Sequence, residues 1–152
     1  MTVSEVAHLL TRAEHYIRQT KYREALAVLD QAIKIDPKNA GIWCLCASAK
    51  IEMEKFADAI ADCERALSIN PNYADAWTKK ALALYHLEQY AASLAASTRA
   101  STLNANDASA WYIKGICLEE LGKSEEAEIA YGKSLELEII LDIKDESKRI
   151  RK

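Results

Sequence analysis

The sequence predicts an all-α protein built from repeated pairs of helices, and two observations support this fold class. Only 4 Gly and 2 Pro occur in 152 residues, which leaves few helix breakers among many good helix formers. The tryptophans Trp43, Trp77 and Trp111 recur at a constant interval, and the same step backward reaches Leu9. We therefore expect four units in one register, within a single domain that covers residues 1–152.

The first half of each unit is expected to be a helix with one large and one small residue on the same face. A small residue follows each large one after four positions, which is the helical spacing for one face. These small residues are Ala13, Ala47, Ala81 and Gly115. Each first helix therefore places a bulky side chain beside a gap that a neighbouring helix can fill.

The second half of each unit is expected to begin a new helix at Tyr22, Phe56, Tyr90 or Ser124. Small residues then recur at two positions that let helices approach closely. They are Ala25, Ala59, Ser93 and Ala127 at the first position, and Ala32, Ala66, Ala100 and Ser134 at the second. The units close with KIDPKNA, SINPNYA and TLNANDA, where proline ends the helix and polar residues can cap the next one. The expected units are 6–39, 40–73, 74–107 and 108–141.

This series of large, small, aromatic and proline positions resembles the tetratricopeptide repeat family over about residues 5 to 141. The resemblance implies a right-handed α-solenoid of four antiparallel helix pairs, in which each pair packs on the next. The chain departs from the family pattern at Ala105 and Ile139, which replace the closing proline, and at Ser124, which replaces the aromatic residue. Lys50 also stands where the first unit has Tyr16.

In this family the first helix of each pair lines a concave surface, and the resemblance implies which residues face it. The inward positions hold Leu10, Thr11, Glu14, Ile17, Arg18, Cys44, Leu45, Ser48, Ile51, Asp75, Thr78, Lys79, Leu82, Tyr85, His86, Ser109, Tyr112, Ile113, Ile116 and Glu119. The partner-binding candidates among them are Leu10, Leu45, Thr78, Lys79, Leu82, Tyr85, Tyr112, Ile113 and Ile116. Such a lining favours a protein or peptide partner that presents an apolar or amphipathic helix. The alternative is that several of these side chains only pack between helices.

The best-known function of the family is to bind the carboxylate tails of chaperones through Lys, Asn and Arg side chains. Here the corresponding positions hold Leu10, Glu14, Leu45, Asp75 and Lys79 or, one unit further on, Cys44, Ser48, Lys79, Ser109 and Ile113. Lys79 lies one turn after Asp75, which neutralises it, so this single lysine cannot hold two carboxylates. We therefore expect no binding of chaperone tails.

The last helix is expected to run without a break to about residue 149, because no proline follows Gly122. Apolar residues continue past the repeat pattern, at Leu135, Leu137, Ile139, Ile140, Leu141 and Ile143. One interpretation is that this helix caps the array and that residues 142–152 form its solvated end. Alternatively, Leu137, Ile140, Leu141 and Ile143 form a surface for a homodimer or a partner helix, which would make the protein a self-assembling repeat. The alternation LELEI also permits this segment to pair as a strand. If the sequence is a domain excised from a longer protein, the chain that follows would cover these apolar residues.

Composition and motifs argue against several other classes of protein. The net charge of −3, from 20 basic and 23 acidic residues, gives no field that attracts nucleic acid. No apolar run is long enough to insert into a membrane, and charge interrupts the N-terminus too early for a signal peptide, so we expect a cytoplasmic protein. The 4 cysteines and 3 histidines lack the spacing of metal ligands, and Cys46, Cys63 and Cys117 fall at core positions. Without a catalytic set or a phosphate-binding loop, we expect a binding protein with no metal, cofactor or enzymatic activity.

Overall fold

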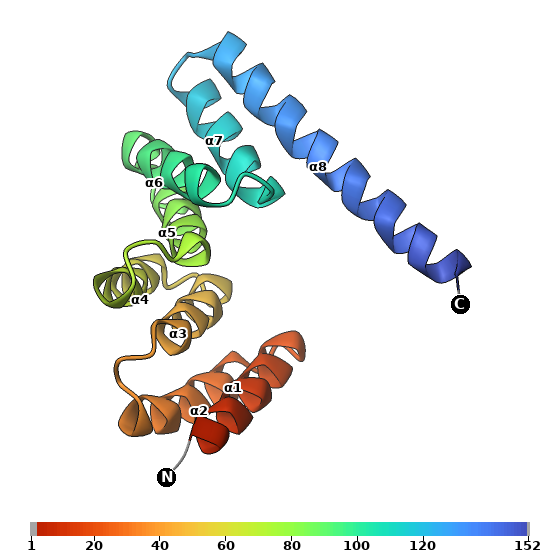
Figure 1. Cartoon of the computed structure of the whole chain (residues 1–152). Helices are drawn as coiled ribbons and strands as arrows, with labels where there is room; N and C mark the ends of the chain where they lie inside the picture. Colours follow the sequence, from red (N-terminus) through yellow and green to blue (C-terminus); the bar gives the residue numbers. More distant parts are fainter. Residues whose placement is uncertain (1–2, 152) are drawn as a thin grey trace.

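The computed structural model describes residues 3–151, which form eight α-helices joined by short turns. The helices are α1 (Val3–Arg18), α2 (Tyr22–Ile35), α3 (Ala40–Glu52), α4 (Phe56–Ile69), α5 (Ala74–His86), α6 (Tyr90–Leu103), α7 (Ala108–Glu120) and α8 (Ser124–Ile150). Each odd-numbered helix pairs with the helix that follows it, and each pair packs on the next to form the curved array of Figure 1. The all-α solenoid of four helix pairs predicted from the sequence is confirmed.

The predicted starting points of the second helices agree with the structure. Tyr22, Phe56, Tyr90 and Ser124 are the first residues of α2, α4, α6 and α8. The polar segments that close the units also cap the next helix in two places. The Asn39 side chain accepts a hydrogen bond from the Gly41 N–H at 3.0 Å, and that of Asp107 accepts one from the Ala110 N–H at 3.2 Å.

The turn inside each helix pair uses one residue in the left-handed region. Thr20, Glu54 and Glu88 each have a φ of 59°, and Gly122, at the same place in the fourth repeat, has a φ of 77°. At the first of these turns the Lys21 N–H donates to the Tyr16 carbonyl at 2.9 Å, and the other turns repeat this bond. Only the fourth turn has the glycine that this conformation favours, so little in the residue types indicates the other three.

The tryptophans join each repeat to the closing turn of the one before. The indole N–H groups of Trp43, Trp77 and Trp111 donate to the carbonyls of Pro37, Pro71 and Ala105 at 3.0, 2.9 and 2.9 Å. A cationic side chain covers each ring: Arg65, Lys80 and Lys114 lie 4.8, 5.4 and 5.1 Å from the ring centroids. The constant interval between the tryptophans therefore reflects a repeated set of contacts as well as repeated burial.

The small residues of the first helices are located where neighbouring helices come closest. Ala13, Ala47 and Ala81 are fully buried. At the fourth position, a Cβ atom on Gly115 would come within 2.7 Å of the ring of Tyr131. The large Tyr131 on α8 therefore requires glycine at this position on α7.

The last helix is long, as predicted, and only its first half packs on the array. Ser134 donates from its hydroxyl to the Ala108 carbonyl at 2.9 Å, at the beginning of α7, so α8 passes the end of its partner soon afterwards. Leu137, which the sequence placed on a possible oligomer surface, is only 6% exposed. The assignment of Leu137 to that surface was therefore wrong, because this side chain packs within the array. The other three residues of the predicted surface, Ile140, Leu141 and Ile143, are exposed. Neither α8 nor any other helix within residues 3–151 is both long enough and apolar enough to cross a bilayer.

Candidate functional site

A groove runs along the first helices of the repeats and consists of two adjoining hollows. The hollow over α1, α3 and α5 has a volume of about 410 Å³ and is lined by Glu14, Ile17, Arg18, Tyr22, Leu45, Ser48, Ile51, Glu52, Lys79 and Leu82. The hollow over α5, α7 and α8 has a volume of about 290 Å³ and is lined by Asp75, Thr78, Lys79, Leu82, Asp107, Ser109, Tyr112, Ile113 and Glu138. Lys79 and Leu82 line both, so we treat these residues together as one concave groove.

Four of the residues predicted to bind a partner lie on the accessible lining of the groove. Leu45, Lys79 and Leu82 are half-buried there, and Tyr112 is 54% exposed. An exposed tyrosine ring beside leucine side chains offers a partner a large contact area. The entropy cost of fixing the ring on binding is small, because tyrosine has few rotatable bonds. The groove therefore provides an apolar floor at its centre and an aromatic ring at its C-terminal end.

Two other predicted residues reach the wall of the groove but are buried in contacts between repeats. Thr78 is 7% exposed, and its hydroxyl donates to the Asp107 carboxylate at 2.7 Å. Ile113 is 4% exposed and packs in the cluster that contains Leu84 and Cys117. We therefore assign Thr78 and Ile113 to the packing of the third repeat on the fourth, which corrects their assignment to a partner.

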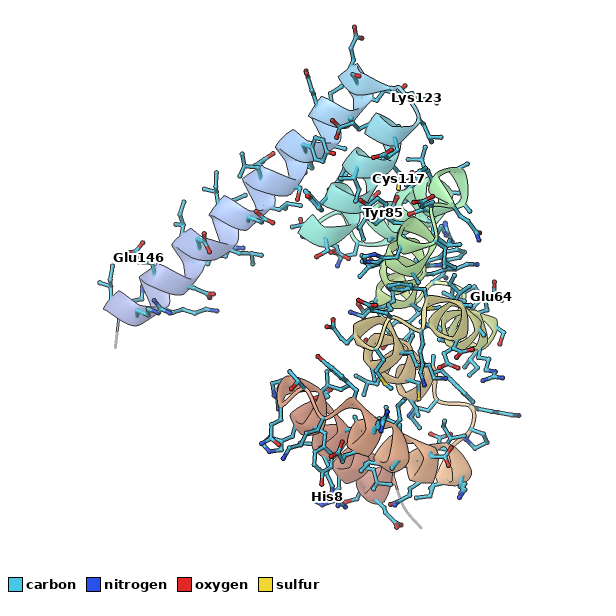
Figure 2. All side chains as sticks on the ribbon, turned by 180° about the vertical axis from the view of Figure 1, so that it is seen from behind. His8, Glu64, Tyr85, Cys117, Lys123 and Glu146 are labelled. Carbon is cyan, nitrogen blue, oxygen red and sulfur yellow. The ribbon has the colours of Figure 1, made fainter. Side chains whose placement is uncertain are left out.

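Three predicted residues lie outside the two hollows. Leu10 packs at the side of the core cluster formed by α1, α2 and α3, and Ile116 is half-buried. Tyr85 packs on the cluster that contains Cys117 (Figure 2). Its ring lies 5.9 Å from that of Tyr90. His86, one of the positions that the family pattern places on the concave surface, stacks on the Phe56 ring at 4.5 Å. These side chains support the shape of the array.

The groove also contains residues that the sequence did not identify. Tyr22, expected only as the first residue of a second helix, lines the first hollow, and its hydroxyl donates to the Glu52 carboxylate at 3.5 Å. Glu138 lines the second hollow from α8, whereas the sequence assigned the groove to first helices alone. The repeated aromatic position was the available signal for Tyr22. No signal of this kind existed for Glu138, because its position depends on the path of α8 along α7.

The charges that line the groove are mostly acidic. Five lining residues are acids and two are bases, namely Glu14, Glu52, Asp75, Asp107 and Glu138 against Arg18 and Lys79. The Lys79 ammonium lies 3.8 Å from the Asp75 carboxylate, so this lysine is already paired, as the sequence predicted. The groove therefore has a net negative charge that favours cationic groups on a partner.

The cysteines take no part in an exposed reactive site. All four are buried and free, including Cys44, which the family pattern had placed on the groove. The Cys44 thiol donates to the Asp75 carboxylate at 3.3 Å, and burial raises its pKa. Burial likewise raises the pKa of Cys46 and of Cys63 to about 12, so both thiols are protonated at neutral pH. Within residues 3–151 no group of three potential metal ligands comes together.

Comparison with family models identifies two matches along the chain. Residues 16–82 match the model described as tetratricopeptide repeat. Residues 56–134 match the model described as anaphase-promoting complex, cyclosome, subunit 3. Among curated protein sequences, none matches the chain.

Several solved structures have the same fold over most of their length. The crystal structure of MamA is 23% identical, and the alignment covers 90% of this chain and 80% of that one with a TM-score of 0.79. The first TPR domain of human RPAP3 is 26% identical over 80% of this chain and 95% of that one, with a TM-score of 0.75. The first TPR of Spaghetti (RPAP3), bound to the HSP90 peptide SRMEEVD, is 24% identical over 80% and 97% of the two chains, with a TM-score of 0.76.

Proposed function

The chain belongs to the tetratricopeptide repeat family, and on this premise we propose that it is a scaffold that holds a basic amphipathic helix of a partner protein in the concave groove. Proteins with this fold act as interaction scaffolds, and some bind peptides, as the Spaghetti domain does. The observation that carries the proposal is the combination of an apolar floor with an acidic lining in one groove. We further propose that the chain acts as one domain without catalytic activity.

The apolar floor supports a helical rather than an extended partner segment. Leu45 and Leu82 lie on successive first helices of the array, and Tyr112 follows on the next one. An amphipathic helix with apolar residues at i, i+3, i+4 and i+7 presents a continuous stripe that such a row of side chains can cover. Ile17 and Ile51 extend the same surface toward the N-terminal end.

The charges of the groove support basic residues beside that apolar stripe. Glu14 and Glu52 line the first hollow, and Glu138 lines the second. Lys or Arg side chains on the flanks of a partner helix would meet these carboxylates at both ends of the groove. The partner proposed here is therefore a helix with an apolar stripe and cationic flanks.

The same charges argue against an acidic tail such as the peptide bound by Spaghetti. Two carboxylates need a fork of cationic donors, whereas Lys79 is paired with Asp75 at 3.8 Å. Arg18 is the other base of the lining and shares its hollow with Glu14 and Glu52. We propose that this chain does not bind acidic tails of that kind. We also propose that it does not bind nucleic acid, because the described lining of the groove includes no unpaired cluster of basic side chains to hold phosphate groups.

The cysteines bear on the compartment in which the protein acts. Four free, buried thiols persist where the surroundings are reducing. We therefore propose a cytoplasmic location. Mass spectrometry of the protein from its native cell would show reduced cysteines, and any disulfide among them would contradict this location.

Calorimetry with two matched peptides tests the proposed partner chemistry. Both peptides carry leucine at i, i+3, i+4 and i+7, and one has lysine flanks where the other has glutamate. We expect the lysine peptide to bind about tenfold more tightly at low salt, with a smaller difference as salt screens the charges. Equal affinity for the two peptides, or micromolar affinity for SRMEEVD, would refute the proposal.

A pair of variants tests whether the groove is the binding surface. Tyr112→Ala removes an exposed ring from the groove and should weaken binding of the lysine peptide severalfold. Ile129→Ala is the matched control, because Ile129 is 72% exposed on α8 and outside both hollows. Binding that is equally sensitive to both substitutions would place the peptide elsewhere.

A further inference from the structure

The second half of α8, from Glu138 onward, extends beyond the array, and Figure 1 shows its C-terminal end well separated from the other helices. We call this segment the extension. α8 has 27 residues, compared with 14 in each of α2, α4 and α6. Among the described residues, α8 makes its close backbone contacts with α7, and every residue from Glu138 to Arg151 is exposed. Glu146, labelled in Figure 2, lies on this extension well away from the array. An isolated helix as short as the exposed segment 138–151 is marginal in water without a partner.

One face of α8 carries a row of exposed apolar side chains that begins at Leu135 and continues along the extension. Leu135, Ile139, Ile143 and Ile150 are 58%, 49%, 59% and 80% exposed. On an α-helix these four residues fall within an arc of about 80°, and the stripe they form is interrupted only by Glu146. We call these four residues the apolar stripe. A contiguous exposed stripe of this kind marks an interaction surface.

The position of the apolar stripe within the repeat indicates that its partner is a helix. Leu135 stands two repeats after Leu67, at the same place in the pattern. Leu67 is 8% exposed because Trp77 and Ala76 of the following repeat pack against it. The face of α8 that begins at Leu135 is therefore the face that accepts a helix elsewhere in this array.

The charges along the extension are separated into an acidic and a basic end. Residues 136–142 contain three acids and no base, namely Glu136, Glu138 and Asp142. Residues 144–151 contain four bases and two acids, namely Lys144, Lys148, Arg149 and Arg151 with Asp145 and Glu146. Two such helices side by side attract each other when they run antiparallel, because the acidic end of each then meets the basic end of the other. A parallel pair would place like charges together.

We propose that the extension of α8 pairs antiparallel with the same segment of a second copy of this chain, which gives a two-fold symmetric homodimer. Ile143 lies near the two-fold axis, and Ile150 of one copy lies near Leu135 of the other. In this register Glu138 faces Arg149 of the second copy, because both residues lie on the same flank of the apolar stripe. Such an interface is isologous, so each charge pair occurs twice.

Analytical ultracentrifugation of the full chain tests the proposed dimer. The expected result is a mass that rises with concentration from 17.0 kDa toward twice that value. The double substitution Ile139→Lys, Ile143→Lys should leave a folded monomer, as judged by circular dichroism. The matched control Ile129→Lys, on the part of α8 that packs on α7, should dimerise like the natural sequence. A monomer at every concentration up to the millimolar range, or equal loss of dimer in the control, would overturn the proposal.

A charge exchange tests the antiparallel direction. Glu138→Lys alone and Arg149→Glu alone should each weaken the dimer, by about tenfold in the dissociation constant at low salt. The two substitutions together exchange the charges, so the double variant should regain most of the original affinity. A double variant that is weaker than either single variant would overturn the antiparallel arrangement. Higher oligomers, or a dimer that persists in the variant Ile139→Lys, Ile143→Lys, would mean that the copies meet at another surface. Either result would overturn the proposed dimer.

Discussion

The crevice between α2 and α4 and the crevice between α4 and α6 occupy equivalent places in successive repeats, but their contents differ. In the α2–α4 crevice, Asp62 is 1% exposed, and its carboxylate contacts the Lys50 ammonium at 2.6 Å and the Arg65 guanidinium at 3.1 Å. In the α4–α6 crevice, Leu84 and Ala96 occupy the repeat positions of Lys50 and Asp62. A buried charge network in one repeat is thus replaced by apolar side chains in the next.

The difference indicates which contacts determine the stacking of the repeats. The helices stack in the same order at both places, although the α2–α4 crevice has a volume of about 410 Å³ and the α4–α6 crevice about 680 Å³. The α4–α6 crevice is lined by the short side chains of Ala92, Ala95 and Ala96. The fully buried small residues such as Ala59 and Ala66 are common to the repeats. We conclude that close helix contacts determine the stacking and that the crevices tolerate different contents.

The largest expected effect comes from removing one partner of the buried network. Lys50→Ala would leave the Asp62 carboxylate buried with only the exposed Arg65 to compensate it. We expect the free energy of unfolding to fall by about 3–5 kcal/mol, measured by urea denaturation. The double variant Lys50→Leu, Asp62→Ala reproduces the residues of the α4–α6 crevice. Its free energy of unfolding should lie within about 1 kcal/mol of that of the natural sequence. A double variant as unstable as Lys50→Ala would show that the two crevices are not interchangeable.

The pH dependence of stability provides a second test, since Cys46 lies in the α2–α4 crevice where the α4–α6 crevice has Lys80. Burial, followed by the Asp62 charge, raises the pKa of Cys46 to about 12. In the unfolded chain the Cys46 thiol has a pKa of 9.0. Its contribution to the free energy of unfolding is therefore complete below pH 9 and is lost as the pH rises toward 12. The loss from this one group is at most about 1.4 kcal/mol per pH unit. Cys46→Ala should therefore flatten the decline of stability above pH 9, and an unchanged decline would contradict burial of the thiol.

The smallest effect is expected from filling the α4–α6 crevice. Ala95 lines it, and the residue one repeat later is Ile129. Ala95→Ile should increase the melting temperature, with a gain of about 0.5–1 kcal/mol, because it covers apolar surface of the crevice. Ala61→Ile, at the same repeat position beside the α2–α4 crevice, is the control and should give no gain. Equal effects of the two substitutions would mean that the larger volume of the α4–α6 crevice has no energetic consequence.

The sequence predicts the frame in which these crevices lie but not what fills them. The constant interval between the tryptophans predicts the register, the repeated aromatic position predicts the helix starts at Tyr22 and Phe56, and the absence of proline after Gly122 predicts the long α8. These features depend on residues close together in the chain. The Lys50–Asp62 pair joins two different helices; the repeat pattern marks Lys50 as a departure but does not identify Asp62 as its partner. The left-handed turns at Thr20 and Glu54 were also missed, because neither residue is the glycine that signals such a turn.

The candidate site was predicted only in part, for a geometric reason. Leu45, Leu82 and Tyr112 face the groove as expected. Thr78 and Ile113 are on the same helices but are buried against the next repeat. Neighbouring positions on a helix differ by about 100° in direction, so a small error in orientation exchanges a groove residue for a packing residue. The acidic lining combines residues from several repeats with one from α8, and no single repeat reveals that combination.

The central claim is that partners bind along the first helices and not in the crevices of the second helices. Nuclear magnetic resonance of the isotope-labelled chain, titrated with the lysine-flanked peptide, tests this directly. We expect amide signals of α1, α3, α5 and α7 to shift, with the largest changes near Leu45, Lys79 and Tyr112. Shifts confined to α4 and α6, around the α4–α6 crevice, would contradict the claim.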